Sequence, residues 1–358
     1  MSQPGTTKPR SVTPPPSLRE PPLTPPSTAK KPVSNTRRVI TLFRNIRAGR
    51  NSEGNNTLRF KLTTGEIDQI QSALQNDVAL LEYVKGSIRC DYDETTLLLQ
   101  IRMPTGVHEF LIDLVEDDIR NQLRAIHERS SSAAHFAESI RPARSTEIRF
   151  ANSKSRFHPD ISFGHKDARF PGLVVEVAFS QEYKHLRRLA ENYILDSDAN
   201  IRIVVGINIA YGNMSRRATI SIWRPRLSKT LRGYDLEVEE EVMDEAFRND
   251  EGGPVEHPGL RFHLSDFTCR RIVEEEMGGE DAELCISGSQ LCQYVATAEN
   301  NVQRAMREEP LPDGIKINKR RRSSTPPEEI RSEDEAKYIQ REEKVAKRED
   351  HDSDYEHE

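Results

Sequence analysis

The sequence predicts an α/β protein with a single central mixed sheet. Residues 172–180 (GLVVEVAFS) and 201–209 (IRIVVGINI) are nearly continuous apolar runs, as expected for strands buried on both faces. The segment between them, Gln181 to Leu195, is amphipathic at helical spacing. A helix that joins two buried strands makes a parallel crossover, and further strands on either side make the sheet mixed and flanked by helices.

Both ends of the chain are expected to be disordered, because the mean hydropathy of −0.72 is too low for the whole chain to be packed. Ten of the 21 prolines lie at or before Pro32, and residues 1–38 carry seven Lys or Arg against one Glu. Residues 328–358 hold thirteen acids against six bases. We therefore expect a basic Pro-rich tail over 1–37, a globular body over 38–310, and a basic cluster with an acidic tail over 311–358.

In the first half of the globular body, the sequence predicts a helix, then three antiparallel strands, then a second helix. The segment from Thr63 to Leu74 has helical spacing, with Thr64 as N-cap, and a second helix is expected over 117–127. Three stretches between them, 86–92, 95–103 and 106–114, have strand-like composition and turn signals at their ends, which predicts a three-stranded antiparallel meander.

The second half contains the predicted sheet. Strands are expected near 158–163, over 172–180 and 201–209, and over 218–223, with the crossover helix over 181–195. Residues 236–259 hold nine acids against one Arg, which indicates an acidic linker. A further strand at 260–264 and a closing helix over 290–302 complete the body. The core motif spans 148–225.

Composition also limits the class of protein. No apolar run approaches the twenty residues of a membrane-spanning helix, which argues against a membrane protein. The four cysteines form no CxxC pair and are expected to be reduced thiols in an intracellular protein. The cluster Lys316–Arg322 (KINKRRR) is an import signal, a phosphate-contacting patch, or a run that balances the acidic tail. Lys319–Arg322 favours the nucleus over the cytoplasm.

Two acids are the candidate metal ligands. Glu176 lies in the middle of an apolar strand, where an unpaired carboxylate would cost at least several kcal/mol, so we expect it to be paired or bound to a metal. The alternative is an edge strand with Glu176 on its wet face. Asp160 lies on the preceding strand, and a hairpin would bring both acids together to hold Mg²⁺ or Mn²⁺. Alternatively, Pro159-Asp160 is an ordinary turn dipeptide.

Pro159-Asp160, then Glu176 in an apolar strand, then a helix with basic residues, resembles the PD-(D/E)xK nuclease superfamily of restriction-endonuclease-like proteins. In that superfamily the two acids bind a divalent metal, and a lysine two residues after the second acid assists the attacking water. Ala178 stands at that position here. The resemblance implies a restriction-endonuclease-like sheet and a further acid from a preceding helix, for which Glu116 and Glu128 are both candidates.

Some fungal and bacterial members of the superfamily are similar to this sequence in carrying the lysine on the following helix. The resemblance therefore makes Lys184 the catalytic lysine, although a lysine there can also be simply solvated. Arg188 lies one helical turn further on. Ser180 and Gln181, at the junction of strand and helix, are expected either to position substrate against the helix N-terminus or to act as caps.

Two functions remain open from the sequence. The first is a divalent-metal-dependent nuclease that hydrolyses nucleic-acid phosphodiester bonds, with DNA favoured over RNA as substrate. The second is a catalytically inactive domain of the same fold that binds nucleic acid or protein. The missing in-line lysine favours the second and the two retained acids favour the first. Restriction-like nucleases often act as dimers, so the resemblance also leaves a homodimer open.

Overall fold

The computed structural model describes residues 34–50, 57–103, 105–129, 132–179, 183–210, 215–231, 233–278 and 280–307. The expectations for residues 1–33 and 308–358, the basic cluster among them, lie outside these residues. The chain divides into two units, Met1–Met306 and Arg307–Glu358, and every element below belongs to the first. Residues 35–37, expected in the N-terminal tail, lie in the first helix.

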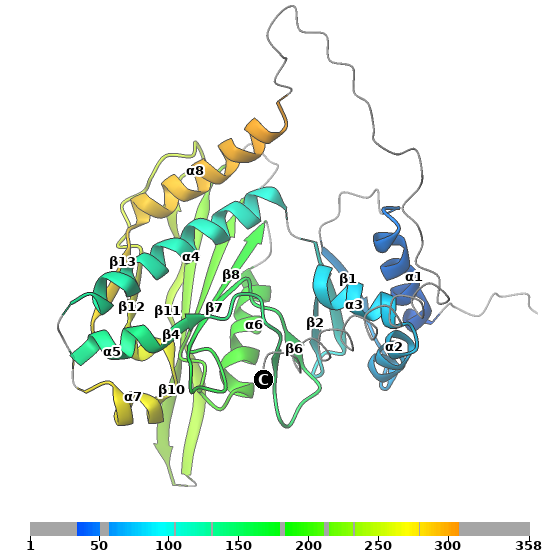
Figure 1. The fold of residues 1–358 in the computed structure, drawn as a ribbon, viewed down its shortest axis with the longest axis horizontal. Coiled ribbons are helices and arrows are strands. Elements are labelled where there is room, and N and C mark those ends of the chain that lie inside the picture. Colours follow the sequence, from blue (N-terminus) through cyan, green and yellow to red (C-terminus); the bar gives the residue numbers. More distant parts are fainter. Residues whose placement is uncertain are drawn as a thin grey trace, which may run out of the picture. The chain divides into compact units, whose positions relative to one another are not determined.

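The described residues form a mixed α/β fold with two larger sheets rather than the single one expected (Figure 1). The N-terminal part contains α1 (Asn35–Arg47), β1 (Thr57–Lys61), α2 (Glu66–Gln75), α3 (Val78–Ser87), β2 (Arg89–Asp93) and β3 (Leu98–Arg102). With β5 (Ile148–Arg149) and β6 (Arg156–Phe157), its strands make an antiparallel sheet in the order β1-β3-β2-β6-β5. This part has its own apolar core, which includes Phe43, Leu80 and Ile101. A separate core explains why its strands form a separate sheet.

The second sheet has six strands in the order β11-β10-β9-β8-β7-β4. Its elements, with the helices between them, are α4 (Gly106–His127), α5 (Ser132–Ser139), β4 (Ile140–Pro142), β7 (Ile161–His165), β8 (Leu173–Phe179), α6 (Tyr183–Asp196), β9 (Ile203–Ile209), β10 (Ala218–Thr230) and β11 (Gly233–Arg248). The predicted parallel crossover is confirmed, because β8 and β9 run parallel on either side of α6. The other pairs in this sheet are antiparallel, so the sheet is mixed.

The chain ends with β12 (Leu260–His263), the short 3₁₀ helix η1 (Leu264–Phe267), α7 (Arg270–Glu276), β13 (Glu283–Ile286) and α8 (Gly288–Ala305). Helices α4 and α8 pack together over one face of the six-stranded sheet, on a core that includes Val175 and Val205 (Figure 1). Helix α6 covers the opposite face, on Val174 and Val204. Successive side chains of β8 point to opposite faces of the sheet, as in any strand, and here both faces are buried. Glu176 shares the α6 face with Val174 and Ala178.

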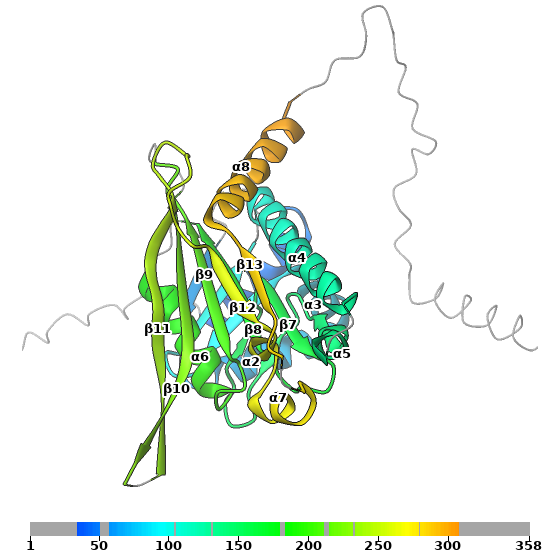
Figure 2. The same cartoon turned by 90° about the vertical axis from the view of Figure 1, so that its left-hand side faces the viewer.

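Three features differ from the sequence expectation. Thr64 is not the N-cap of α2; Gly65 holds that position, with a left-handed backbone and no capping side chain. Residues 106–114, expected to be a strand, form the first turns of α4, because the Thr105 hydroxyl caps the helix by accepting from the His108 N–H and Leu111, Val115 and Ile119 continue the apolar spacing. Residues 236–248 of the expected acidic linker lie in β11. Its exposure alternates with period two, and it pairs with β10 over its length (Figure 2). Most acids of β11 are exposed, among them Glu237, Glu239 and Glu241, and charge at this sheet edge discourages further strand pairing.

Candidate acidic site

Asp160 and Glu176 are brought together by the β7–β8 hairpin. Asp160 immediately precedes β7, Glu176 is at the centre of β8, and the register pairs Ile161 with Val175. The Val177 N–H donates to Asp160 Oδ2 at 2.7 Å, which fixes the Asp160 side chain against β8. Both acids are buried, with 2% and 3% exposure. Glu176 therefore does not lie on a wet face, since β8 is an interior strand.

A guanidinium group lies between the two acids. Arg102, the last residue of β3, places Nη1 3.1 Å from Asp160 Oδ1 and 3.0 Å from Glu176 Oε2. Its Nε lies 2.8 Å from Asp91 Oδ2, and its Nη2 donates to the His158 carbonyl. The acids come from the six-stranded sheet and the arginine from the five-stranded one. One cationic nitrogen thus already bridges the proposed metal ligands.

Three further side chains complete the network around the acids. Arg89 Nη1 lies 2.6 Å from Asp160 Oδ1, and His108 Nε2 lies 3.0 Å from Asp160 Oδ2. The Tyr193 hydroxyl, on α6, donates to Glu176 Oε1 at 2.7 Å. Asp160 therefore faces three basic side chains and one backbone N–H, which together satisfy both of its oxygens.

The two acids differ in their electrostatics. Burial opposes the ionisation of Asp160, but His108, Arg102 and Arg89 hold its pKa well below the ordinary value. Burial raises the pKa of Glu176, and although Arg102 opposes this, the neighbouring charge of Asp160 adds to it. Such divergence between paired carboxyl groups is typical of functional sites, although structural ion pairs also produce it. The pKa values of the two acids are thus shifted in opposite directions, because Asp160 faces three basic side chains and Glu176 faces one.

His108 predicts a specific pH dependence of stability. Burial lowers its pKa, but the charge and hydrogen bond of Asp160 outweigh this and raise the pKa to about 9. Because the folded pKa lies above the unfolded one, the stabilisation is fully present below pH ~6.5 and is lost as the pH rises towards 9. We expect a loss of about 2–3 kcal/mol across this window in urea unfolding. A His108→Gln variant should not show this loss of stability between pH ~6.5 and 9. If the variant and the wild type lost the same stability over this range, the loss would not come from His108.

The other predicted site residues are placed less centrally. Lys184 is exposed near the start of α6, and among the described residues no ion pair or hydrogen bond joins it to Asp160 or Glu176. Arg188 points to the N-terminal part, where its Nε lies 3.0 Å from Asp93 Oδ2. Ser180 and Gln181 lie outside the described residues. The structure therefore brings together the two acids but not the basic residues expected to assist them.

Neither candidate for the additional acid reaches the pair. The Glu116 carboxylate is held by Arg144 at 3.2 Å, and Glu128 is exposed at the C-cap of α4. Helix α4 contributes His108 instead. Sequence reasoning missed this residue because its segment resembled a strand, and it missed Arg89 and Arg102 because they are distant in sequence. Arg89 begins β2 and Arg102 ends β3, and a charged residue at the end of a strand was the one sequence feature that could have marked them as candidates.

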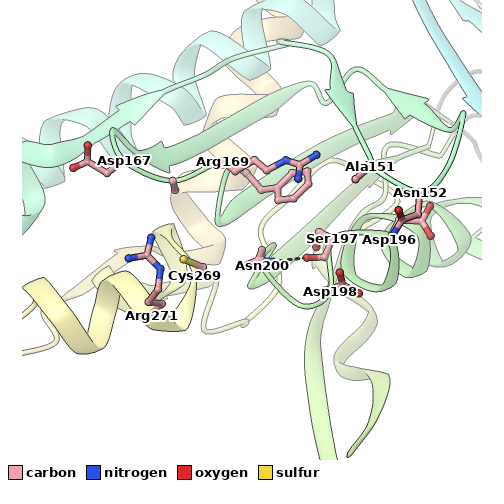
Figure 3. Close-up of a pocket in the computed structure, with 12 residues that line it drawn as sticks. Ala151, Asn152, Asp167, Arg169, Asp196, Ser197, Asp198, Asn200, Cys269 and Arg271 are labelled. Atoms are coloured by element: carbon pink, nitrogen blue, oxygen red, sulfur yellow. Dashed lines mark hydrogen bonds between the residues drawn. The ribbon is translucent and has the colours of Figure 1, made fainter.

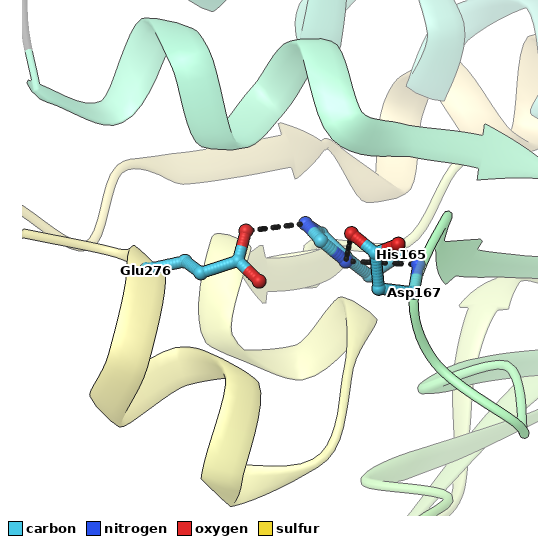
Figure 4. Close-up of side chains that lie close together, drawn as sticks. All are labelled: His165, Asp167 and Glu276. Carbon is cyan, nitrogen blue, oxygen red and sulfur yellow. Dashed lines mark hydrogen bonds and ion pairs between the residues drawn. The ribbon is translucent and has the colours of Figure 1, made fainter.

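A second cluster lies outside this site (Figure 4). Ligand atoms of His165, Asp167 and Glu276 lie within 4.8 Å of one another. The Asp167 N–H donates to His165 Nδ1, so the ring proton is on Nε2, which lies 3.4 Å from Glu276 Oε2. The two carboxylates approach opposite ring nitrogens, Asp167 at 3.8 Å from Nδ1 and Glu276 at 3.4 Å from Nε2, so both nitrogens already face an acid. We assign this cluster to side-chain pairing.

A pocket of about 290 Å³ is also separate from the acid pair (Figure 3). Charged side chains of both signs line it, among them Asp167, Arg169, Asp198 and Arg271, but neither Asp160 nor Glu176 does.

Within the described part of the chain, no helix is long and apolar enough to cross a membrane.

Comparison with known proteins gives no family. No family model matches the chain, and no curated protein matches it. The geometry of the acidic site is therefore the main basis for a functional proposal.

Proposed function

We propose that the protein is a divalent-metal-dependent nuclease that hydrolyses nucleic-acid phosphodiester bonds, with Asp160 and Glu176 as metal ligands. One observation carries the proposal: two buried carboxylates from neighbouring strands converge on a single cationic nitrogen, at 3.1 and 3.0 Å. Paired carboxylates held away from water are expensive unless a cation lies between them. Their convergence, together with the resemblance to PD-(D/E)xK nucleases, supports a site built for a cation.

The donor set fits Mg²⁺ or Mn²⁺ in kind, since both ions prefer carboxylate oxygens and retain several waters. The position between the acids is taken by Arg102, so metal binding requires this guanidinium to move. A bound metal would polarise a phosphate oxygen and acidify a water. Arg102 ends β3, and displacement of its side chain would leave a cationic group beside the site, where it could stabilise charge on a phosphate.

Lys184 is the proposed lysine of this site. Its exposed side chain at the start of α6 is unpaired among the described residues, so it can change rotamer at little cost. Asp160 needs no such movement, because the Val177 N–H and His108 hold it in place on the side away from Arg102.

A binding module without catalysis is the second candidate. It is favoured by the saturation of Asp160, whose Oδ1 faces Arg89 and Arg102 and whose Oδ2 faces His108 and the Val177 N–H. A buried carboxylate with partners on both of its oxygens is what a structural junction between the two sheets would require.

Calorimetric titration of the whole protein with Mn²⁺, combined with cleavage of supercoiled DNA, single-stranded DNA and RNA, tests the proposal. We expect metal binding and cleavage by the wild type, and loss of both in Asp160→Asn and Glu176→Gln. Glu283→Gln, at an exposed carboxylate on β13, is the matched control and should leave both unchanged. A wild type that binds no metal and cuts nothing would contradict the nuclease and favour the binding module. Lys184→Gln should reduce cleavage without reducing metal binding.

A further inference from the structure

Helix α1 carries an unusual concentration of positive charge. Its thirteen residues contain Arg37, Arg38, Arg44 and Arg47 and no acid, and Arg50 follows its end. All five arginines are exposed. We propose that Arg37, Arg44 and Arg47, called here the α1 arginine row, form a surface that binds the phosphate backbone of nucleic acid. In the proposed nuclease, this row would be the surface that binds the substrate, and that role rests on the proposed function. Binding of nucleic acid by the row does not depend on catalysis.

The row is suited to a repeating anion. Arg37 and Arg44 are seven residues apart and so nearly in line along the helix, and Arg47 follows Arg44 by three. The row spans about 15 Å at 1.5 Å per residue, a length over which a duplex presents several phosphates. Arginine also matches phosphate oxygens with two parallel donors.

The charge of the row is largely uncompensated. Within the described residues, Arg37 and Arg47 make no ion pair, and Arg44 has one, to Asp77 at 3.3 Å. The helix dipole favours bases in the last turn, which accounts for Arg44 and Arg47 as ordinary helix-ending residues. It disfavours Arg37 in the first turn, where α1 has no acid of its own and the Glu66 carboxylate of α2 is already used in accepting from the Asn35 N–H at 3.0 Å. A ligand with negative charge explains this arrangement along the whole helix.

The helix is held firmly for this purpose. Val39, Ile40 and Phe43 anchor the helix in the N-terminal core. Arg47, seven residues after Ile40, follows this buried stripe and is exposed because it is at the end of the helix. The Ser34 hydroxyl caps the helix by accepting from the Arg37 N–H. The neighbouring α3 is less suited to bind phosphate, because its only charged residues are Glu82 and Lys85. The same part of the chain supplies Arg89 and Arg102 to the acidic site.

Fluorescence anisotropy with the full-length protein tests the proposal. The probes are a labelled 30-nucleotide single strand of DNA, the corresponding RNA and a 30-base-pair duplex, all in EDTA so that no metal-dependent cleavage occurs. The test variant is Arg37→Gln/Arg44→Gln/Arg47→Gln. The matched control is Arg261→Gln/Arg270→Gln/Arg271→Gln, which removes the same charge from other exposed sites. Single-residue Arg37→Glu, at a residue without an ion pair, guards against misfolding of the triple variant.

We expect the test variant to lose affinity on the order of 100-fold at low salt and the salt slope of log K to fall by about 2–3 units. Arg37→Glu should weaken binding in the same direction, while the control stays within a few-fold of wild type. Equal losses in both triple variants, or no binding by wild type, would overturn the proposal. Preferential binding of a synthetic peptide of residues 328–358 in place of nucleic acid would also overturn it, in favour of an acidic polypeptide. Normal binding without cleavage in Mn²⁺ would instead contradict only the nuclease.

Discussion

Replacing Arg102 by methionine is expected to destabilise the protein by about 3–5 kcal/mol in metal-free buffer, because it leaves the carboxylates of Asp91, Asp160 and Glu176 buried without their shared cation. Urea unfolding in EDTA measures this. Addition of Mn²⁺ should recover part of the loss, by ~2.7 kcal/mol when the free metal is 100-fold above its dissociation constant. The wild type should gain less, since Arg102 competes for the same position.

Arg188→Met is the control for this prediction. Arg188 is also a charged partner between α6 and the N-terminal part, but its side chain is exposed and pairs with Asp93 rather than with the acid pair. We expect a small loss of stability and no recovery with Mn²⁺. If Arg102→Met were as stable as wild type in EDTA, the guanidinium would not be the counter-charge of the acids.

Replacing Asp160 by asparagine should destabilise the protein by a comparable amount. This replacement removes a negative charge, whereas Arg102→Met removes a positive one. The neutral amide leaves Arg89, Arg102 and His108 with too little negative charge, and we expect a loss of about 3–5 kcal/mol in urea unfolding. The pKa of His108 should also fall, because the charge of Asp160 is what holds it near 9 against burial. An NMR titration of the His108 ring measures this separately from stability.

Asp117→Asn provides the comparison on the surface of α4. Asp117 is exposed and pairs only loosely with Arg120, at 3.7 Å, so its replacement should change stability by less than about 0.5 kcal/mol. If the two asparagine variants had similar stabilities, or if His108 still titrated near pH 9 without Asp160, the network would not depend on the Asp160 charge.

The parts of the fold that the sequence predicts best are those set by local pattern. The apolar runs of β8 and β9 and the amphipathic α6 between them require a buried parallel crossover, and the structure contains it. Composition was misleading where two patterns overlapped. In α4, β-branched and aromatic residues near Val107 and Phe110 resembled a strand, although Thr105 caps a helix there. In β11, the density of acids concealed an alternation of exposure that pairing with β10 requires.

The acid pair of the site could be predicted, but its basic partners could not. Asp160 and Glu176 lie sixteen residues apart on one hairpin, so local topology brings them together. Arg102 lies more than fifty residues before Asp160 and belongs to a different sheet, and no period or spacing links it to the acids. Buried ion pairs of this kind are set by tertiary packing. Lys184, expected from the resemblance to assist, remains a proposal because it is exposed and unpaired among the described residues.

The most direct test of the central claim, that Asp160 and Glu176 form a cation site in which Arg102 is the resident cation, is calorimetric Mn²⁺ binding to wild type, Arg102→Met and Arg102→Met/Glu176→Gln. We predict at least about tenfold tighter binding to Arg102→Met than to wild type, equivalent to about 1.4 kcal/mol, and loss of this gain in the double variant. Equal Mn²⁺ affinity in all three proteins would contradict the claim and assign the network to structural pairing between the two sheets.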